Sequence, residues 1–380
     1  MKLIKRPVYH KSLIIITVLL CILGMISLFS ASLSLLDSQM TFYRTLLIQL
    51  VSLSIGFLMI YLAIYIKSID YRLLYKKSYA LYFFIATLFL QLLVFSPLGV
   101  TKNGANRWLD IGITVIQPSE LFKIAIIIML AFLIVRFRKE IDNIWYTLGI
   151  IGLLASIFFV LMISIRDMGT LFITSIACLA MLLVSRIRFR YTLGIFLLAG
   201  LALGGYILFT PQGEYARERI HAYSNENYDP QGNGYQIIQS VMTIGAGEII
   251  GRGFGESLQK HKHLPEPLTD SIFAVYSEEW GFAGTMALLS LYFLLFYSGL
   301  KIALDTREEF GRYIAVGLTV LLLAQALYNI MAMLGMLPLS GMPLVFISKG
   351  GSSIVTSLLV IAILVNISRI TLSNRRSQRI

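Results

Sequence analysis

Ten apolar segments, each about long enough to cross a bilayer, constrain what this chain can fold into. A hydrocarbon layer of roughly 30 Å needs about 20 helical residues to cross it, and in lipid the backbone must satisfy its hydrogen bonds within the segment. The mean hydropathy is +0.78, and 14% of the residues are charged, against roughly 25% in soluble domains. The chain is therefore predicted to be an all-α polytopic membrane protein with ten transmembrane helices, at residues 12–36, 45–66, 79–96, 119–135, 144–165, 168–184, 191–210, 282–300, 313–337 and 353–370.

The distribution of lysine and arginine predicts how these helices are oriented. Short connections rich in these residues stay in the cytoplasm, and most of the 32 basic residues lie near the two ends of the chain and in alternate connections. Both termini are therefore expected to be cytoplasmic, with a large extracellular loop at 211–280 between spans seven and eight. The first span is too long for a signal-peptide core and no cleavage motif follows it, so it is expected to remain as an anchor. Residues 1–380 are treated as one membrane domain.

Other classes of function are disfavoured by composition. The net charge of +12 comes from residues that flank the spans rather than from one soluble basic face, so nucleic acid is not an expected partner. Cys21 and Cys178 fall within spans and are expected to pack as small apolar groups. The histidines, including His221, His261 and His263, lack a metal-binding spacing. No protein metal site and no organic cofactor are predicted.

Ionisable residues are placed at membrane depth on the outer side, after spans three and five. Turn formation accounts for the glycines and prolines there, but it does not account for charges. Lys123 lies inside the fourth span, where an unpaired cation is costly, and Glu120 shares its helical face three residues earlier. A structural ion pair and a functional site are both consistent with this pair. Arg166 and Asp167 are expected to form a mutual salt bridge at the interface.

The stretch "LPEPLTDSIFAVYSEEWGF", residues 264–282, places carboxylates immediately before an apolar run. Its prolines bar a helix before Leu268, and Thr269 or Asp270 is expected to cap the helix that follows. Asp270 also lies where an aqueous group and a lipid-anchored substrate would meet. Further along, either Glu278 or Glu279 is expected to face protein.

A glycine-rich stretch, "GAGEIIGRGFG" at 245–255, resembles a phosphate cradle only superficially. Glycines let backbone N–H groups approach anions, but the strand and helix of a nucleotide fold do not flank this one. It is interpreted as a flexible or re-entrant loop, with Arg252 as a candidate anion contact.

Six motifs in order resemble signatures of one family. They are "SLFSAS" (27–32), "NGANRWLDIG" followed by "IQPSELFK" (103–123), "RDMGT" (166–170), "GNGYQIIQS" (232–240), "LPEPLTDSIFAVYSEEWGF" (264–282) and "LPLSGMPLVFISKGGSS" (337–353). The chain is similar over its whole length to the SEDS family of bacterial cell-wall polymerases, the FtsW, RodA and SpoVE group. The resemblance implies polymerisation of lipid II into peptidoglycan glycan strands on the outer face of the cytoplasmic membrane.

The family resemblance also implies roles for individual residues. The essential aspartate of the family maps onto Asp270, which would act as general base on the acceptor hydroxyl. The family's loop tryptophan and its basic neighbour map onto Trp108 and Arg107, and the lysine after "QPSEL" maps onto Lys123. Cations would stabilise the departing pyrophosphate, either basic side chains or a divalent cation such as Mg²⁺ or Mn²⁺. The predicted substrate-binding set is Arg107, Trp108, Glu120, Lys123, Asp167, Arg252, Glu266, Lys349 and Ser352.

The chain departs from the family pattern at four positions. Arg166 stands where proline is usual, Leu268 where histidine is common, Ser271 where an aromatic residue is usual, and Lys349 where tyrosine is common. These changes bear on rate and donor preference and leave Asp270 in place.

Two other functions remain as alternatives: a lipid II flippase, and a non-catalytic scaffold for a transpeptidase in which Asp270 only caps a helix. The motifs "QKHKHLPEP" and "SLFSAS" resemble the division and sporulation branch more than the elongation branch. The family also implies a class B penicillin-binding protein as partner.

Overall fold

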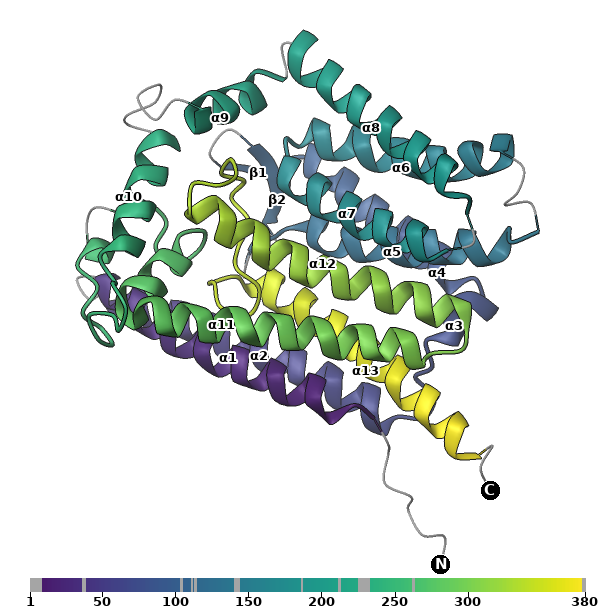
Figure 1. Cartoon of the computed structure of the whole chain (residues 1–380), viewed down its shortest axis with the longest axis horizontal. Helices are drawn as coiled ribbons and strands as arrows, with labels where there is room; N and C mark the ends of the chain where they lie inside the picture. The colour runs from purple at the N-terminus through teal and green to yellow at the C-terminus, as the bar shows by residue number, and fades with distance from the viewer. Residues whose placement is uncertain are drawn as a thin grey trace, which may run out of the picture.

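The computed structural model describes residues 9–35, 39–102, 105–110, 112, 115–139, 144–185, 187–210, 213–224, 233–261 and 264–377. The side chain of His221, the whole of His263 and parts of the loop predicted at 211–280 lie outside the described residues. Each predicted span overlaps one helix (Figure 1). These helices are α1 (Lys11–Ser32), α2 (Gln39–Tyr65), α4 (Tyr79–Leu92), α5 (Pro118–Arg136), α6 (Ile144–Ser164), α7 (Met168–Val184), α8 (Phe189–Phe209), α11 (Ile272–Asp305), α12 (Glu309–Met333) and α13 (Gly351–Ser377).

Seven of these helices are long and apolar enough to cross a membrane, namely α1, α2, α5, α8, α11, α12 and α13. The helices α4 and α7 are apolar but shorter, and a 3₁₀ turn at Leu93–Phe95 extends α4. Helix α6 is apolar over Gly149–Ser164, the part whose side chains the structure describes. The all-α polytopic class is confirmed, whereas the total of ten crossings stays a prediction.

The helices surround a core built on α5, α12 and α13. In the most apolar window of α5, 83% of the residues are buried inside the protein, against 6% in α8. Helix α5 packs on α4, α7 and α12, while α13 packs on α2, and α11 packs on α1 and α12. A helix that is apolar on every side is stable either inside a protein or in lipid. Because α5 is mostly buried, it is surrounded by protein, whereas α8 is mostly exposed and would face lipid.

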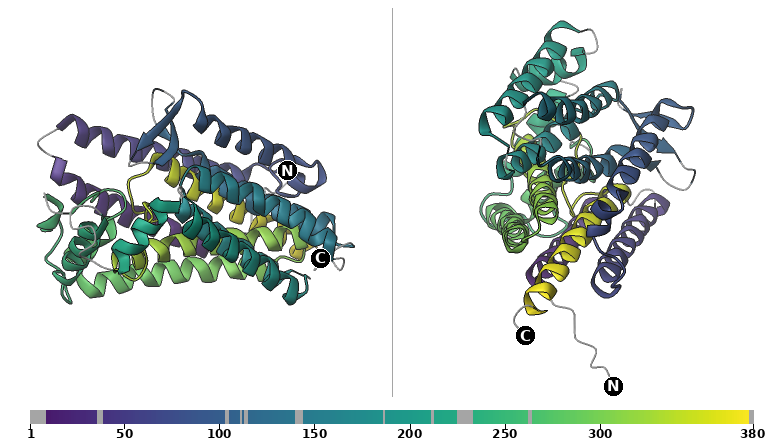
Figure 2. Two further views of the ribbon diagram at one scale, coloured as in Figure 1. Left: turned by 90° about the horizontal axis from the view of Figure 1, so that it is seen from above. Right: turned by 90° about the vertical axis from the view of Figure 1, so that its right-hand side faces the viewer.

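The two ends of the bundle differ in kind. Figure 1 shows the start of α1 and the end of α13 at one end, and the strands with α9 (Glu214–Ser224) and α10 (Asn233–Gly245) at the other. The left view of Figure 2 shows the same separation from above. This arrangement agrees with the prediction that the termini share one side and the polar segments lie on the opposite side.

Three short strands form a sheet that the sequence analysis did not predict. Strands β1 (Gly99–Lys102), β2 (Ala105–Asp110) and β3 (Val115–Ile116) are antiparallel in the order β1-β2-β3, with Val100 paired to Trp108 and Leu109 to Ile116. The sheet follows α4 and leads into α5, where Pro118 occupies the first turn. Because side chains alternate along β2, Arg107 and Leu109 are buried while Trp108 is on the other face.

Helix α11 is broken at Gly281, where φ is +64° and ψ is −167°. The segment after α10, predicted as a flexible or re-entrant loop, packs into this break. The amide of Arg252 donates to the Glu278 carbonyl at 3.0 Å, and the amide of Phe282 donates to the Glu248 carbonyl at 2.9 Å. The glycine-rich loop therefore replaces helical hydrogen bonds that the break removes.

The connection between α12 and α13, residues 338–350, is irregular yet largely buried. Side chains of α12 hold its carbonyl groups: Gln325 donates to Pro343 at 3.2 Å, Asn329 to Met342 at 2.8 Å and Tyr328 to Pro338 at 2.9 Å. Non-helical backbone is tolerated at membrane depth only where protein or water satisfies it. These bonds explain how the segment can enter the bundle.

Candidate functional site

A polar cavity of about 850 Å³ opens at the end of the bundle that carries the strands and α9. Its walls come from the start of α2, strand β2, α9, α10, the turn before α11 and the connection into α13. Segments far apart in the sequence thus converge on one space. Six of the ten predicted site residues line it: Arg107, Trp108, Glu266, Asp270, Lys349 and Ser352.

Asp270 lies in the turn before α11, and neighbouring elements hold its backbone. Asn329 of α12 donates to the Asp270 carbonyl at 2.9 Å, and Ser348 donates to the Thr269 carbonyl at 2.6 Å. The expected cap was wrong, because Ser271 is the N-cap residue, and its side chain makes no capping hydrogen bond. The half-buried Asp270 carboxylate makes no hydrogen bond with any described residue and lines the cavity.

Burial and neighbouring charges set the basicity of Asp270. Burial raises the pKa of its carboxyl group, the negative charge of Glu266 raises it further, and Arg219 and Arg107 partly offset these effects, leaving a pKa of about 6. Glu266 is exposed and accepts a hydrogen bond from the Thr269 hydroxyl at 2.8 Å. Asp270 is therefore ionised at neutral pH and is a stronger base than an ordinary aspartate.

Arg107 in the cavity wall forms an ion pair with Asp167, which is buried and does not line the cavity. Their closest charged atoms, Arg107 Nη1 and Asp167 Oδ1, are 3.8 Å apart, and Arg107 Nη2 donates to the Arg166 carbonyl. The salt bridge expected between Arg166 and Asp167 is thus replaced by one with Arg107. Burial raises the pKa of Asp167, but Arg107 and the hydrogen bonds from Ser119 and Thr170 outweigh it, so the pKa is lowered.

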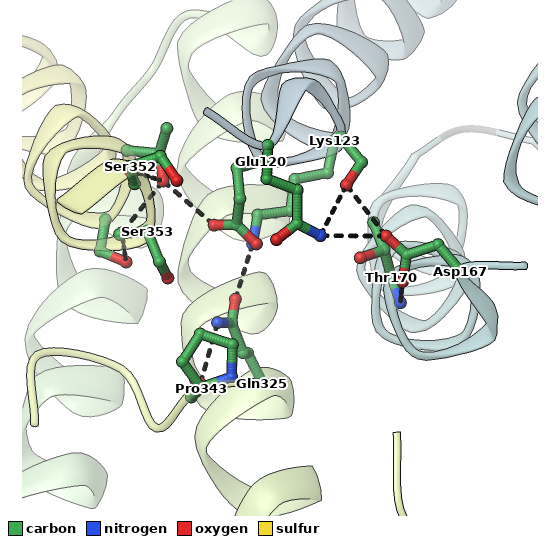
Figure 3. Close-up of polar contacts among 12 residues, drawn as sticks. Glu120, Lys123, Asp167, Thr170, Gln325, Pro343, Ser352 and Ser353 are labelled. Atoms are coloured by element: carbon green, nitrogen blue, oxygen red, sulfur yellow. Dashed lines mark hydrogen bonds and ion pairs between the residues drawn. The ribbon is translucent and has the colours of Figure 1, made fainter. Parts of the chain in front are cut away.

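The pair predicted between Glu120 and Lys123 is present in the interior, as Figure 3 shows. Lys123 Nζ lies 2.9 Å from Glu120 Oε1 and donates to Gln325 Oε1 at 2.7 Å. Thr356 of α13 donates to the other Glu120 oxygen at 3.1 Å. Neither Glu120 nor Lys123 lines the cavity, and both are about 3% exposed.

This network connects α5 to the cavity wall. Gln325 receives the Lys123 hydrogen bond with its oxygen and donates with its nitrogen to the Pro343 carbonyl (Figure 3). Pro343 belongs to the irregular segment that lines the cavity beside Gly341. A Cβ at Gly341 would stand 3.4 Å from Asp270 Oδ2. Lys123 and Glu120 are therefore linked to the cavity wall through Gln325 and Pro343, and Asp167 is linked to it through Arg107.

Arg252, the remaining predicted residue, does not lie at the cavity. Its Nε is 3.5 Å from Glu278 Oε1 in the segment packed against the break in α11. Glu278 also accepts from the Ser257 hydroxyl at 2.5 Å, and Glu279 pairs with Lys260 at 2.9 Å. Both glutamates are buried, where one was expected, and they secure the outer loops.

Two cavity arginines were missed by the sequence analysis. Arg219 of α9 lines the cavity and donates to the Leu339 carbonyl at 2.6 Å. Arg44, near the start of α2, lies on the same cavity as Lys349, whose Nζ donates to the Thr45 hydroxyl at 3.0 Å. The sequence feature that could have identified them is the small number of basic residues in the outer segments, because each such residue is a candidate for binding an anionic substrate.

Comparisons with known proteins identify the family. A family model described as "Cell cycle protein", that of FtsW, RodA and SpoVE, matches residues 11–372. The chain is 34% identical to stage V sporulation protein E of Bacillus subtilis over 363 residues, covering 94% of this chain and 96% of the relative. It is 36% identical over 301 residues to the probable peptidoglycan glycosyltransferase FtsW of Geobacter metallireducens, covering 79% of each.

Solved structures show the same fold. A chain from a peptidoglycan synthase complex that coordinates polymerization and crosslinking has a TM-score of 0.75 and 28% identity, covering 95% of this chain and 98% of that one. The rod shape determining protein RodA of Thermus thermophilus has a TM-score of 0.66 and 24% identity, covering 95% of this chain and 97% of RodA. A family match across nearly the whole chain, relatives of similar length and a shared fold show that this protein belongs to the FtsW, RodA and SpoVE family of membrane proteins.

Proposed function

We propose that this protein is a peptidoglycan glycosyltransferase that polymerises lipid II into glycan strands at the outer face of the cytoplasmic membrane. The observation that carries the proposal is Asp270, a carboxylate with a pKa of about 6 in the wall of a large polar cavity. Family membership and the name of the Geobacter relative, a probable peptidoglycan glycosyltransferase, support the reaction class.

The proposed step is a single displacement. The 4-hydroxyl of the acceptor sugar gives its proton to the Asp270 carboxylate while its oxygen bonds to the anomeric carbon of the donor. The bond from that carbon to pyrophosphate breaks, and its electron pair leaves with undecaprenyl pyrophosphate. Inversion converts the α-linked donor into a β-1,4 product, so one carboxylate suffices. A general base is most effective when its pKa lies near the working pH.

Basic side chains around the cavity are proposed to stabilise the leaving group. Arg107, Arg219, Arg44 and Lys349 all line it. A Cβ at the cavity residue Gly341 would stand 4.0 Å from Arg107 Nη1 as well as 3.4 Å from Asp270 Oδ2, so this guanidinium lies close to the proposed base. Preorganised cations in a site with restricted water stabilise developing negative charge efficiently. This set replaces the predicted one, in which Arg252 and Lys123 were to contact substrate.

A divalent cation remains a separate proposal. The carboxylates that line the cavity are Asp110, Glu266 and Asp270. Among the described residues, no three His, Cys, Asp or Glu side chains lie close enough together to hold a metal ion. Protein ligands alone therefore do not fit a metal site here, and the mechanism contains no step through one.

The membrane setting and the partner complete the proposal. The cavity lies at the end opposite the start of α1 and the end of α13, so predicted cytoplasmic termini place it outside. A role in division or sporulation accords with the relatives named FtsW and stage V sporulation protein E. Similarity to a chain of a peptidoglycan synthase complex supports a partner, which we propose to be a class B penicillin-binding transpeptidase.

Two observations favour a polymerase over the alternatives. A scaffold in which Asp270 only caps a helix is disfavoured because Ser271 occupies the cap position of α11. A flippase needs a polar path between the two membrane faces. The described cavity lies at one end, and the charged pair deeper in the bundle, Glu120 with Lys123, is closed by its own hydrogen bonds.

The decisive experiment is polymerisation of labelled lipid II by the purified protein, alone and with a candidate class B partner, read on a gel that resolves glycan strands. Asp270→Asn keeps the size of the side chain and removes the base, so no strands are expected. Asp110→Asn is the matched control, because it removes another carboxylate from the same cavity, and it should still polymerise. Strand synthesis by Asp270→Asn at the wild-type rate would exclude the proposed mechanism.

A further inference from the structure

A second cavity, of about 460 Å³, lies at the end of the bundle opposite the Asp270 cavity. It is bounded by the last two turns of α2, the connection through α3 (Arg72–Lys76) to Tyr79 at the start of α4, and the middle of α13. Figure 1 shows α3 at the same end as the start of α1 and the end of α13. The volume falls within the range of small-molecule sites, roughly 300–1,000 Å³.

The interior of this cavity is suited to hydrocarbon. Most of its lining is aliphatic, from Met59 and Leu62 of α2 to Leu359 and Ile363 of α13. The amide nitrogen of Asn366, which lines the cavity, already donates to the Ala63 and Ile69 carbonyls. A bound water needs two to four polar partners, and this lining has few to give.

Other polar atoms of the lining are also occupied. The Asn366 carbonyl oxygen accepts from the Tyr71 amide at 3.0 Å, and the Tyr71 hydroxyl donates to Glu308 at 2.9 Å. Asp70 accepts from the Arg72 amide at 2.8 Å and lies 4.0 Å from the Arg72 side chain. The acidic groups near the cavity are thereby engaged with protein partners, which leaves the apolar lining for a ligand.

The rim of the cavity carries uncompensated positive charge. Lys77 Nζ lies 5.8 Å from the centre of the Tyr79 ring, which lines the cavity, and Lys67 is adjacent to the lining residue Ser68. Both lysines are exposed, and neither forms an ion pair with any described carboxylate. An apolar chamber with a cationic rim at the edge of the membrane is complementary to an anionic amphiphile.

We propose that this cavity binds one anionic phospholipid from the bilayer, with an acyl chain between α2 and α13 and its phosphate beside Lys67 and Lys77. Depth supports this assignment: Met59 lies six residues before the end of α2 at Tyr65, which places it about 9 Å along the helix from the membrane edge. The lipid would join α2, α3 and α13. This inference does not depend on the chemistry proposed for Asp270.

The test uses full-length protein stripped of lipid in neutral detergent and titrated with dioleoyl phosphatidylglycerol or dioleoyl phosphatidylcholine. Native mass spectrometry counts the lipids that each molecule retains. One phosphatidylglycerol should be retained at concentrations where phosphatidylcholine is not. Equal retention of the two lipids would overturn the charge argument, leaving adventitious hydrophobic occupancy.

Two kinds of variant separate the acyl chamber from its charged rim. Ala362→Phe fills the chamber and should abolish retention of both lipids, whereas Ala202→Phe, on an exposed face of α8, should not. The double change Lys67→Gln with Lys77→Gln should weaken phosphatidylglycerol on the order of tenfold and leave phosphatidylcholine unchanged. Lys11→Gln, an exposed lysine near the same end, is its control.

The thermal melt of each variant without lipid shows whether it is folded. If Ala362→Phe proves unstable, Ser68→Trp at the exposed rim blocks entry without altering the packed face of α13. Undiminished phosphatidylglycerol retention by either folded blocking variant would show that lipid does not enter this cavity.

Discussion

The pKa of Asp270 makes a quantitative prediction for the pH dependence of polymerisation. With a pKa of about 6, kcat/KM should fall about tenfold between pH 7 and pH 5, because a general base is lost as it is protonated. An aspartate with the ordinary value of 3.8 would stay almost fully ionised over that range, and the rate would change by less than about 10%. Initial rates of lipid II polymerisation at limiting substrate measure this difference.

Two substitutions assign the titration to Asp270, since the substrate also carries ionisable groups. Glu266→Gln removes a negative charge that raises the pKa of Asp270, so the midpoint should move to lower pH. Arg219→Gln removes a positive charge that lowers it, so the midpoint should move to higher pH. The rate itself should fall in Arg219→Gln, so the midpoint is the quantity to compare. A profile that is flat to pH 5, or midpoints that move in the same direction, would refute the reasoning.

Three further predictions concern the supporting structure. Lys123→Ala leaves Glu120 buried without its ion-pair partner and should lower the free energy of unfolding by about 3–5 kcal/mol. Thermal melts measure the loss. If adding Glu120→Gln restores part of the stability, the loss comes from the unpaired charge of Glu120 and not only from the packing of the lysine side chain. Gly281→Ala places a Cβ 2.3 Å from the Gly251 amide nitrogen at a φ of +64° and should cost at least about 1–3 kcal/mol, seen as a lower Tm. Arg252→Gln should keep the polymerisation rate of the folded protein within about twofold because Arg252 does not line the cavity, and a larger loss would return Arg252 to the site.

An ion pair between residues close in the sequence could be predicted, whereas an ion pair between residues far apart in the sequence could not. Glu120 and Lys123 are three residues apart on α5, and helical geometry alone places them together. Asp167 was assigned to its neighbour Arg166, but strand β2 brings Arg107 to it across 60 residues of chain. A buried carboxylate pairs with the cation that the tertiary fold places beside it.

The outer segments show the same limit. The sequence placed Asp270 between a loop and a span, but the choice of cap, the sheet at residues 99–116 and the burial of the 338–350 segment depend on contacts with other helices. Arg219 becomes a cavity residue because α9 is positioned beside the turn that carries Asp270. Arg252 leaves the site because its segment fills the break in α11.

The sequence by itself determined the class of fold and the family, and it predicted the location of the chemistry. Lipid forces each apolar segment to satisfy its own backbone, so hydropathy alone predicts where the helices are, and the six ordered motifs predicted the family and Asp270. Only the tertiary structure decided which charges far apart in the sequence meet. The cavity assembles side chains from α2, β2, α9, the turn before α11 and the connection into α13, and the pKa of Asp270 depends on burial and on charges brought there by separate elements. The distances between these charges are set by the way the helices pack, and no local pattern of residues determines that packing.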